Sequence, residues 1–433
     1  MANEEARVRT FQTDQQPRRV EDTFFMRFPY LRILELSDSL VQSIPDYIGK
    51  LIYPRLLDLD GTCVSCLPES ISSLINLQIL NLQRCQDLHS LPLAITRLSN
   101  LRRLGLAGTP INQVPEGVGR LKHLNDLGGF PVGGVSDDAK TQNGWKLEEL
   151  EHLSHLRRLD LIKLERAALH TTGSVLADKR YPTWLGTTHL SSLKHLKLVD
   201  CKTCVYLPPI GQLANLRYLK IDGTTKVTKI GPEFVGCRGA RANPRSMVSV
   251  AFPKLEVLVI RDLPNWEDWS FIEDAAGAAA TEGGGDIYAE MRKGEALSPR
   301  LHLLPRLKKM ELGGCPKLRA LPRQPGRHAT SLKELHLRGA SCLKVVEDLQ
   351  FLSEKLLIVG CEGLERVSNL PQVRELRLHD SPNLRRVEGL GSLQQLWLTK
   401  NMRDIPVLWM LGLQEQHREL HGEDVDVCTW CKG

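Results

Sequence analysis

The sequence predicts an α/β solenoid, in which short parallel strands stack along one axis and the chain returns outside each strand. Residues 77–98 and 101–121 carry this prediction, because they align with a period of 24 residues. Both begin with the pattern LxxLxLxx, the strand of a leucine-rich repeat, and continue with a return segment. One unit cannot bury its apolar edge alone, so we expect a curved horseshoe with a concave parallel sheet and an irregular or helical convex side. The aligned pairs are Leu77 and Leu101, Leu80 and Leu104, Leu82 and Leu106, Cys85 and Thr109, Leu91 and Val114, Pro92 and Pro115, Ile95 and Val118, and Leu98 and Leu121.

The length and composition agree with a soluble repeat protein. At 433 residues a single compact core would divide into domains, whereas a solenoid grows in one dimension. The net charge of +6 is too weak to indicate nucleic acid as a partner. The N-terminus lacks the apolar segment of a signal peptide, and no run reaches the roughly 18 apolar residues of a membrane helix. We therefore expect a cytoplasmic chain whose eleven cysteines stay reduced.

The repeats of the first half follow from successive strand starts. Residues 1–27 are polar and include a first strand at Val8–Phe11. The second unit starts with proline where the pattern has leucine, so its strand should pair imperfectly there. The fifth unit degenerates into a glycine-rich run, which predicts either a loop or a bulge. Residues 146–153 predict a helical turn and residues 165–180 a helix-like segment. The strand starts are Leu31, Pro54, Leu77, Leu101, Leu124 and Leu156.

The second half contains shorter repeats and one insertion. Residues 273–286 are rich in alanine, glycine and acidic residues, a composition typical of a disordered loop. The repeats after Leu307 have periods of 20 to 25 residues, which leave room for a turn and little helix on the outer face. The strand starts are Leu193, Leu216, Leu255, Leu307, Leu332, Ser353, Val373 and Leu393.

The resulting organisation has seven segments, and the last one should form a cap. Helical periodicity from residue 405 onward predicts a helix that covers the last apolar edge of the stack. The segments are 1–27, polar with a first strand; 28–130, an N-terminal repeat block; 131–192, an irregular region with one repeat; 193–270, a middle block; 271–300, a disordered insertion; 301–400, a C-terminal block; and 401–433, a cap and tail.

A small polar or thiol residue recurs at the ninth position of the repeats. Buried amides and carbonyls in a turn need hydrogen-bond partners, and a small side chain can supply one there. This role accounts for four of the eleven cysteines without any catalytic or metal chemistry. The ninth positions are Cys85, Thr109, Cys201, Thr224, Cys315, Cys361 and Ser381.

No catalytic, cofactor-binding or metal-binding residue is predicted. Three CxxC pairs occur, at Cys63/Cys66, Cys201/Cys204 and Cys428/Cys431. A structural zinc site needs four converging ligands, and the first two pairs lie roughly 30 Å apart at the usual strand spacing. The first two pairs are therefore interpreted as structural, while the third could be reactive. No P-loop, HExxH or GxSxG motif is present, so we expect a chain that is not an enzyme.

The predicted binding surface is the concave face. Side chains at the third and fifth strand positions point to this face, and stacking lines them up in rows. From Arg103 to Lys220 these positions are mainly basic with one tyrosine, a pattern that suits a protein partner with an acidic face. A solvated charged face without a partner is the other interpretation of the pattern. The predicted partner-binding residues are Arg103, Arg158, His195, Lys197, Tyr218, Lys220, Lys309, His336, Arg377 and Trp397.

Four segments resemble the leucine-rich-repeat region of plant nucleotide-binding resistance proteins, and most closely the coiled-coil class found in cereals. They begin at Phe28, Gly108, Tyr181 and Phe252. The phrases LPPIGQL at 207–213 and LPNWEDW at 263–269 are the more specific ones, whereas LxxLxL alone is generic. The likeness extends from about residue 8 to the C-terminus.

The resemblance implies a recognition module in plant defence. In this family a coiled-coil domain signals, a nucleotide-binding domain switches between ADP and ATP, and the repeats sense a pathogen effector and hold the switch off. It implies that the concave positions contact an effector, and that the basic N-terminal repeats dock on the nucleotide-binding domain of the same or a related receptor.

Two departures from the family pattern predict a truncated or partial resistance protein. The coiled-coil and nucleotide-binding segments are not in the sequence, and strand starts jump from Leu156 to Leu193, as if repeats were missing near residues 178–182. The alternative function is a cytosolic signalling scaffold or ubiquitin-ligase adaptor without an immune role.

Overall fold

The computed structural model describes residues 8–12, 19–112, 114–133, 144–164, 190–235, 248–269, 300–321, 331–399 and 408–430. The predicted helix-like segment at 165–180, the missing repeats near 178–182 and almost all of the predicted insertion at 271–300 lie outside these residues. The chain divides into two compact units. Unit 1 comprises Met1–Cys204 and Asn215–Thr224, and unit 2 comprises Val205–Ala214 and Thr225–Gly433.

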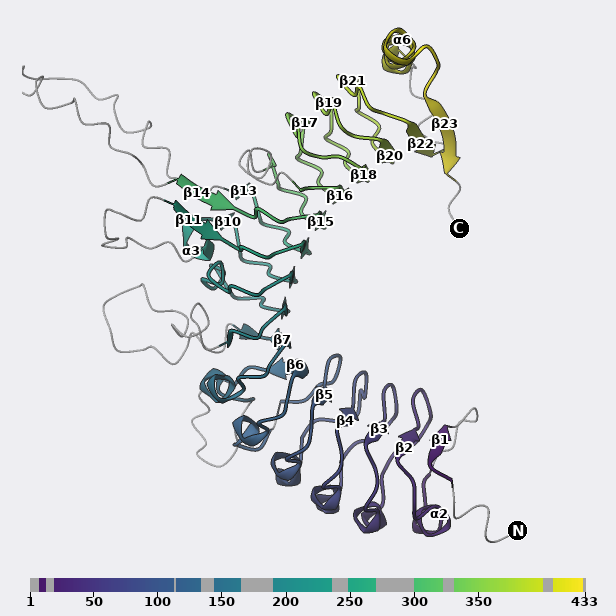
Figure 1. The fold of residues 1–433 in the computed structure, drawn as a ribbon, viewed down its shortest axis with the longest axis vertical. Helices are drawn as coiled ribbons and strands as arrows, with labels where there is room; N and C mark the ends of the chain where they lie inside the picture. The colour runs from purple at the N-terminus through teal and green to yellow at the C-terminus, as the bar shows by residue number, and fades with distance from the viewer. Residues whose placement is uncertain are drawn as a thin grey trace, which may run out of the picture. The chain divides into compact units, whose positions relative to one another are not determined.

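Unit 1 is a stack of short parallel strands with one strand per repeat (Figure 1). Each strand pairs with the strand of the next repeat, as in the register Ile79↔Arg103 between β4 and β5. The predicted solenoid is therefore confirmed. The strands are β1 (Thr10–Gln12), β2 (Ile33–Glu35), β3 (Leu56–Asp58), β4 (Ile79–Asn81), β5 (Arg103–Gly105), β6 (Asp126–Pro131), β7 (Arg158–Ile162), β8 (His195–Val199) and β9 (Tyr218–Asp222).

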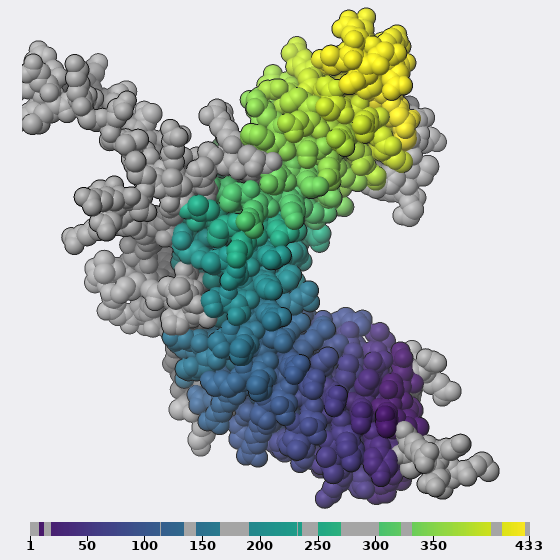
Figure 2. Space-filling view, viewed as in Figure 1, coloured from purple at the N-terminus to yellow at the C-terminus, as the bar shows by residue number. Residues whose placement is uncertain are grey.

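The core of unit 1 consists of rows of leucine at the fourth and sixth strand positions. Leu80, Leu82, Leu104 and Leu106 are fully buried. Strand side chains alternate in direction, so these two positions point inward while the third and fifth point to the opposite face. In the space-filling view the colour of unit 1 changes gradually along the stack, so residues close in sequence lie next to one another (Figure 2). Burial of each leucine side chain contributes roughly 1.5–3 kcal/mol to folding.

The convex side of unit 1 carries five short 3₁₀ helices among the described residues, one in each of five successive repeats. Prolines 45, 68 and 92 stand immediately before three of these helices with extended backbone angles. Each of the three buries an isoleucine against the core, which explains why one turn is sufficient. The helices are η1 (Asp46–Lys50), η2 (Glu69–Ser73), η3 (Leu93–Arg97), η4 (Val118–Arg120) and η5 (Leu147–His152), the last at the predicted helical turn.

The N-terminal segment forms one more repeat. Strand β1 begins two residues later than predicted and pairs with β2 through Thr10↔Ile33. Helix α2 (Asp22–Arg27) stands where later repeats have a 3₁₀ helix, and its Phe25 is fully buried. The rings of Phe11 and Phe24 meet edge to face with centroids 4.7 Å apart. Aromatic packing thus covers the first apolar edge of the stack.

Strand β6 decides between the two structures predicted for the glycine-rich fifth unit. The strand continues through the glycines to Pro131, and its register with β7 shifts between Leu127 and Phe130. Gly128 and Gly129 thereby stand opposite Asp160 alone, so the feature is a β-bulge and not a loop. Gly129 has a φ of +88°, in the region where glycine is favoured.

Unit 2 contains the strands of the shorter repeats. They stack in parallel and in regular register, as between Met310 of β15 and Leu335 of β16. The convex strands β17 (Val345–Glu347), β19 (Arg366–Ser368) and β21 (Arg386–Glu388) form a second parallel sheet where unit 1 has 3₁₀ helices (Figure 1). The main strands are β12 (Val257–Arg261), β15 (Lys309–Gly313), β16 (Glu334–Arg338), β18 (Lys355–Val359), β20 (Glu375–His379), β22 (Gln395–Thr399) and β23 (Asp426–Trp430).

The remaining elements of unit 2 lie on the convex side or at its end. Helix α6 (Leu408–His421) is the predicted C-terminal helix and buries Trp409, Leu413 and His417 on one face. Strand β23 follows it and pairs with β22 through Trp397↔Cys428, which the sequence did not indicate. Two strand pairs, β10 (Lys229–Ile230) with β13 (Asp268–Trp269) and β11 (Val248–Ala251) with β14 (Arg300–Leu303), and helix α3 (Pro232–Val235) complete the unit.

The ninth-position residues form the predicted contacts with the turns, except Thr224, whose buried hydroxyl has no hydrogen-bond partner among the described residues. Cys85 Sγ donates to the carbonyl of Leu59 over 3.0 Å, and Cys315 Sγ donates to that of Gly313 over 3.3 Å. Both thiols are buried, as is the thiol of Cys361. Ser39 and Thr62, which were not among the predicted residues, donate to the carbonyls of Leu36 and Leu59 in the same way.

Burial should make these thiols slow to react. It raises the pKa of Cys85 and Cys361, and raises the pKa of Cys315 to about 12. The thiolate is the nucleophile, so in native protein we expect iodoacetamide to alkylate the exposed Cys66 and Cys342 at least roughly tenfold faster than these three. Peptide mass spectrometry against time measures the rates, and denaturation in urea should make all five similar. Equal rates in the native protein would show that the ninth-position thiols are accessible.

Candidate binding surface

Two rows of side chains cross the concave face of unit 1. Register pairing places Arg103, Asp126, Arg158, His195 and Tyr218 side by side at the third strand position of β5 to β9. The fifth position forms the second row. Its members are Gly105, Gly128, Asp160, Lys197 and Lys220. Six residues predicted from sequence are therefore brought together here, in four of five neighbouring strands.

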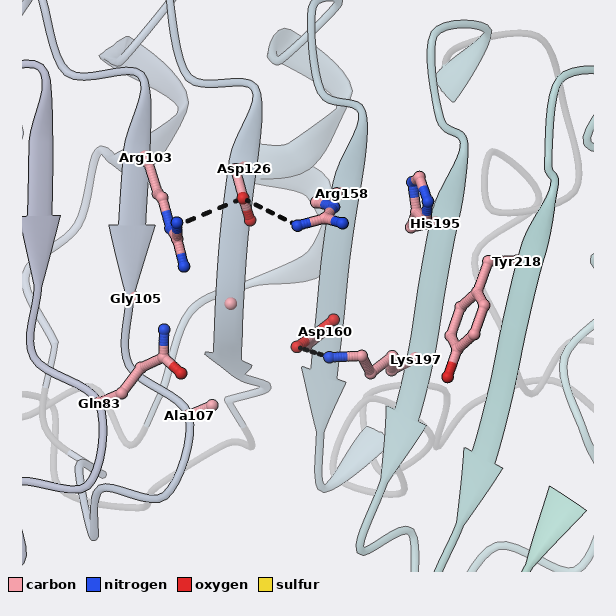
Figure 3. Close-up of a pocket in the computed structure, with 11 residues that line it drawn as sticks. Gln83, Arg103, Gly105, Ala107, Asp126, Arg158, Asp160, His195, Lys197 and Tyr218 are labelled. Atoms are coloured by element: carbon pink, nitrogen blue, oxygen red, sulfur yellow. Dashed lines mark hydrogen bonds and ion pairs between the residues drawn. The ribbon is translucent and has the colours of Figure 1, made fainter. Parts of the chain in front are cut away.

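Asp126 stands between two guanidinium groups (Figure 3). Its Oδ2 lies 3.7 Å from Nε of Arg103 and 3.8 Å from Nη1 of Arg158. Burial raises the pKa of the Asp126 carboxyl, and the charge of Asp160 adds to this effect, while the two arginines oppose it. The carboxylate is 20% exposed, whereas the arginine side chains are 43% and 56% exposed.

The lysines of the second row each bind a carboxylate directly. Nζ of Lys197 donates to Oδ2 of Asp160 over 2.8 Å, and Nζ of Lys220 lies 2.6 Å from Oδ2 of Asp222. This part of the concave face is therefore ion-paired, although its two rows still carry four lysine and arginine side chains against two carboxylates. The predicted stripe did not include Asp126, nor the ion pairs that Asp160 and Asp222 make with the two lysines.

The histidine and tyrosine of the first row lie next to each other. The ring centroids of His195 and Tyr218 are 5.9 Å apart. Burial lowers the pKa of His195, and the neighbouring charge of Arg158 lowers it further. A neutral imidazole beside a phenol gives this end of the row a less charged, aromatic character.

Two glycines open a hollow between the rows. Gly105 and Gly128 carry no side chain at the fifth position, so the backbone of β5 and β6 forms the floor of a cavity of about 320 Å³. A Cβ atom on Gly128 would meet nothing closer than 3.9 Å. The lining residues are Gln83, Arg103, Gly105, Ala107, Asp126, Gly128, Arg158, Asp160, His195, Lys197 and Tyr218. Gln83, Ala107, Asp126 and Gly128 were missed by sequence reasoning, although counting two residues on from Leu124 would have found Asp126.

The other four predicted residues lie in unit 2 and are engaged with neighbours. Nζ of Lys309 lies 3.0 Å from Oε2 of Glu334, which lowers the pKa of that carboxyl. His336 is buried beside the same carboxylate, and burial lowers its pKa. Arg377 pairs with Glu375, and its guanidinium carbon lies 4.8 Å from the ring centre of Trp397. These contacts stabilise the strand stack.

The cysteine pairs show no sign of metal coordination in the described part of the chain. No group of three or more His, Cys, Asp or Glu residues there could hold a metal ion. Cys201 and Cys204 are buried, while Cys63 is half-buried and Cys66 exposed. Cys431 of the third pair lies outside the described residues. Among those residues, too, no helix has both the length and the apolar character that a membrane crossing requires.

Comparison with protein families and curated proteins agrees with this architecture. The family described as Leucine-rich repeat region matches residues 7–176, and the family R13L1/DRL21 LRRs matches residues 175–224. The disease resistance RPP13-like protein 1 of Arabidopsis thaliana is 28% identical over 274 residues, which cover 59% of this chain and 24% of that protein. The disease resistance protein RGA4 of Solanum bulbocastanum is 31% identical over 260 residues, covering 49% of this chain and 26% of that protein.

Solved leucine-rich-repeat structures are similar at lower identity. A leucine-rich-repeat protein of Leptospira interrogans has a TM-score of 0.49 and 16% identity, with 98% of this chain and 97% of that chain covered. The chain spans about a quarter of the length of the two plant relatives. The strand stack and the matched families lead to one conclusion: this chain is a leucine-rich-repeat protein, related over about half its length to plant disease resistance proteins.

Proposed function

We propose that the concave face of unit 1 is a protein-recognition surface that acts in plant defence, as part of a cytoplasmic, non-enzymatic module. The observation that carries this proposal is the hollow floored by Gly105 and Gly128, ringed by half-exposed charged and aromatic side chains. The leucines of the same strands are buried, so the rows at the third and fifth positions are the surface offered to a partner. Aromatic and arginine side chains around a recess are the composition typical of protein interfaces.

The partners proposed for this surface are a pathogen effector and the nucleotide-binding domain of the same or a related receptor. Both plant relatives are named disease resistance proteins, and both are about four times as long as the part this chain matches. A surface of alternating ion pairs recognises a partner through matched charges, which favours specificity and association rate over affinity. Contact with the nucleotide-binding domain would restrain its switch, and contact with an effector would signal infection.

Reversing the four cations of the surface should abolish binding. The test variant is R103E/R158E/K197E/K220E, because each change places a carboxylate beside an existing one. The matched control is K50E/R97E/R120E/K122E, which changes the net charge equally at exposed positions on or next to the 3₁₀ helices. The assay is a pull-down of purified nucleotide-binding domains of plant resistance receptors and of purified pathogen effectors.

We expect the wild-type chain and the control to retain at least one of these partners, and the test variant to bind it roughly tenfold or more weakly. Circular dichroism checks that both variants are folded. If the test variant and the control capture the partner equally well, or if both lose it, the assignment of the surface is overturned.

A further inference from the structure

The ion pairs of the concave face differ in the distance between their charged nitrogen and oxygen atoms. Lys197 and Lys220 approach their carboxylates at 2.8 and 2.6 Å, within hydrogen-bond distance. Arg103 and Arg158 stop at 3.7 and 3.8 Å from Asp126. Among the described residues, the Asp126 carboxylate accepts no hydrogen bond and neither guanidinium donates one. Asp126, Arg103 and Arg158 thus lie close together without the hydrogen bonds that each could make.

The two arginines retain their full donor capacity toward an incoming group. A guanidinium carries five N–H donors in a planar fork that matches a carboxylate. Arg103 and Arg158 lie on opposite sides of Asp126 and line the hollow, and both are more exposed than the carboxylate between them (Figure 3). Because Gly128 leaves the adjoining space open, a side chain from a partner can reach both guanidinium groups.

We propose that Arg103 and Arg158 form a clamp for a carboxylate side chain of a protein partner, and that Asp126 is an internal competitor that lowers the affinity of this clamp. The inference rests on the proposed recognition surface and names the chemistry that it recognises. Three cations and two carboxylates line the hollow, and one carboxylate, Asp160, is already satisfied by Lys197. An incoming anion balances this set of charges, whereas an incoming cation increases the excess of positive charge.

Asp126 sets the selectivity of the clamp because a bound carboxylate must lie close to it. Two carboxylates at such a distance repel each other unless one of them is protonated. Asp126 therefore admits only groups whose bonds to both arginines outweigh this repulsion. A partner that offers a single weakly placed acidic residue is rejected, which is a form of specificity obtained by repulsion.

Replacing Asp126 by asparagine should therefore strengthen binding. The probe is a fluorescein-labelled dodecapeptide of glycine, serine and four glutamates, and its counterpart has glutamine at the four positions. Fluorescence anisotropy at low ionic strength measures both with the full chain. We expect D126N to bind the glutamate peptide about tenfold more tightly than wild type does, because the clamp can make charge-assisted hydrogen bonds without competition.

Matched variants separate the clamp from a general change in charge. D160N adds the same net charge and releases Lys197, so we expect it to tighten binding less than about threefold. D126N combined with R103Q and R158Q should lose the gain completely. The inference is overturned if D126N does not bind more tightly, if D160N gives an equal gain, or if the glutamine peptide binds equally well. Competition by inorganic phosphate at lower concentration than acetate would reassign the clamp to phosphate groups. None of these measurements uses a natural partner, so the clamp can fail or succeed independently of the proposed function.

Discussion

Replacement of Gly129 by alanine is expected to unfold the centre of unit 1, whereas the same replacement at Gly128 is expected to be tolerated. A Cβ atom on Gly129 would lie 2.5 Å from the backbone nitrogen of Ala107 and 2.6 Å from the carbonyl carbon of Leu106. Both atoms belong to the backbone that follows β5, which cannot move aside without breaking the strand stack. The φ of +88° adds strain for any residue with a side chain.

The expected cost for Gly129→Ala is about 3 kcal/mol or more, from overpacking and from the backbone conformation together. For Gly128→Ala the new methyl group meets only ordinary contacts, with Oδ2 of Asp160 at 3.9 Å, and we expect a change of less than about 1 kcal/mol. Hydrogen exchange followed by mass spectrometry measures the stability of each segment separately, which suits a repeat array that need not unfold in one step. Faster exchange should appear in β5 to β7 for Gly129→Ala and be absent in unit 2. Equal protection in the two variants would show that the bulge is not where the structure places it.

The bulge also explains why the sequence predicted the repeats better than the binding surface. The leucine rows were predictable, because stacked strands require an apolar residue at fixed positions and Leu80, Leu82, Leu104 and Leu106 satisfy this. The glycines from 128 onward suggested a break, so the row of concave residues was read from Arg103 directly to Arg158. A bulge accommodates an extra residue and keeps the strand, so Asp126 remains in the row.

Charge balance could not be predicted from the same pattern. The residue types at the third and fifth positions do not show which side chains contact each other across neighbouring strands. Asp160 and Asp222 become partners of Lys197 and Lys220 only when side-chain directions are known. The boundary between the two units likewise falls within the predicted middle block at 193–270. The sequence did not indicate it, because strand starts continue across it without a change of pattern.

Trp145 is the residue of the irregular region that the sequence could not place. It lies beyond the described end of β6, in a segment of polar residues and glycines, and yet its side chain is fully buried. Its backbone bridges Val132, and its indole N–H donates to the carbonyl of Pro115 over 2.7 Å. Its ring packs at 5.3 Å from that of Phe130. Trp145 thereby ties the bulged repeat to the return segment of the repeat before it.

Replacing Trp145 by alanine is expected to destabilise unit 1 by about 4 kcal/mol, since a large buried ring is removed and a cavity remains. Replacing it by phenylalanine keeps most of the packing and loses the hydrogen bond to Pro115, which leaves a buried carbonyl without that partner. We expect about 2 kcal/mol for this change, roughly half from the hydrogen bond and half from the smaller ring. Hydrogen exchange followed by mass spectrometry compares the free energy of local opening of β5 to β7 in the two variants.

The difference between these two variants tests what holds the bulged strand in the stack. If packing against Phe130 dominates, W145F retains about half or more of the stability that W145A loses. If W145F and W145A are equally unstable, the hydrogen bond to Pro115 is the essential contact. If neither variant loses stability, the segment after β6 is not part of the core, and the strand must be held by its pairing with β5 and β7 alone. Because the hollow floored by Gly128 depends on the position of β6, the comparison shows whether Trp145 or the pairing with β5 and β7 holds the floor of the binding surface in place.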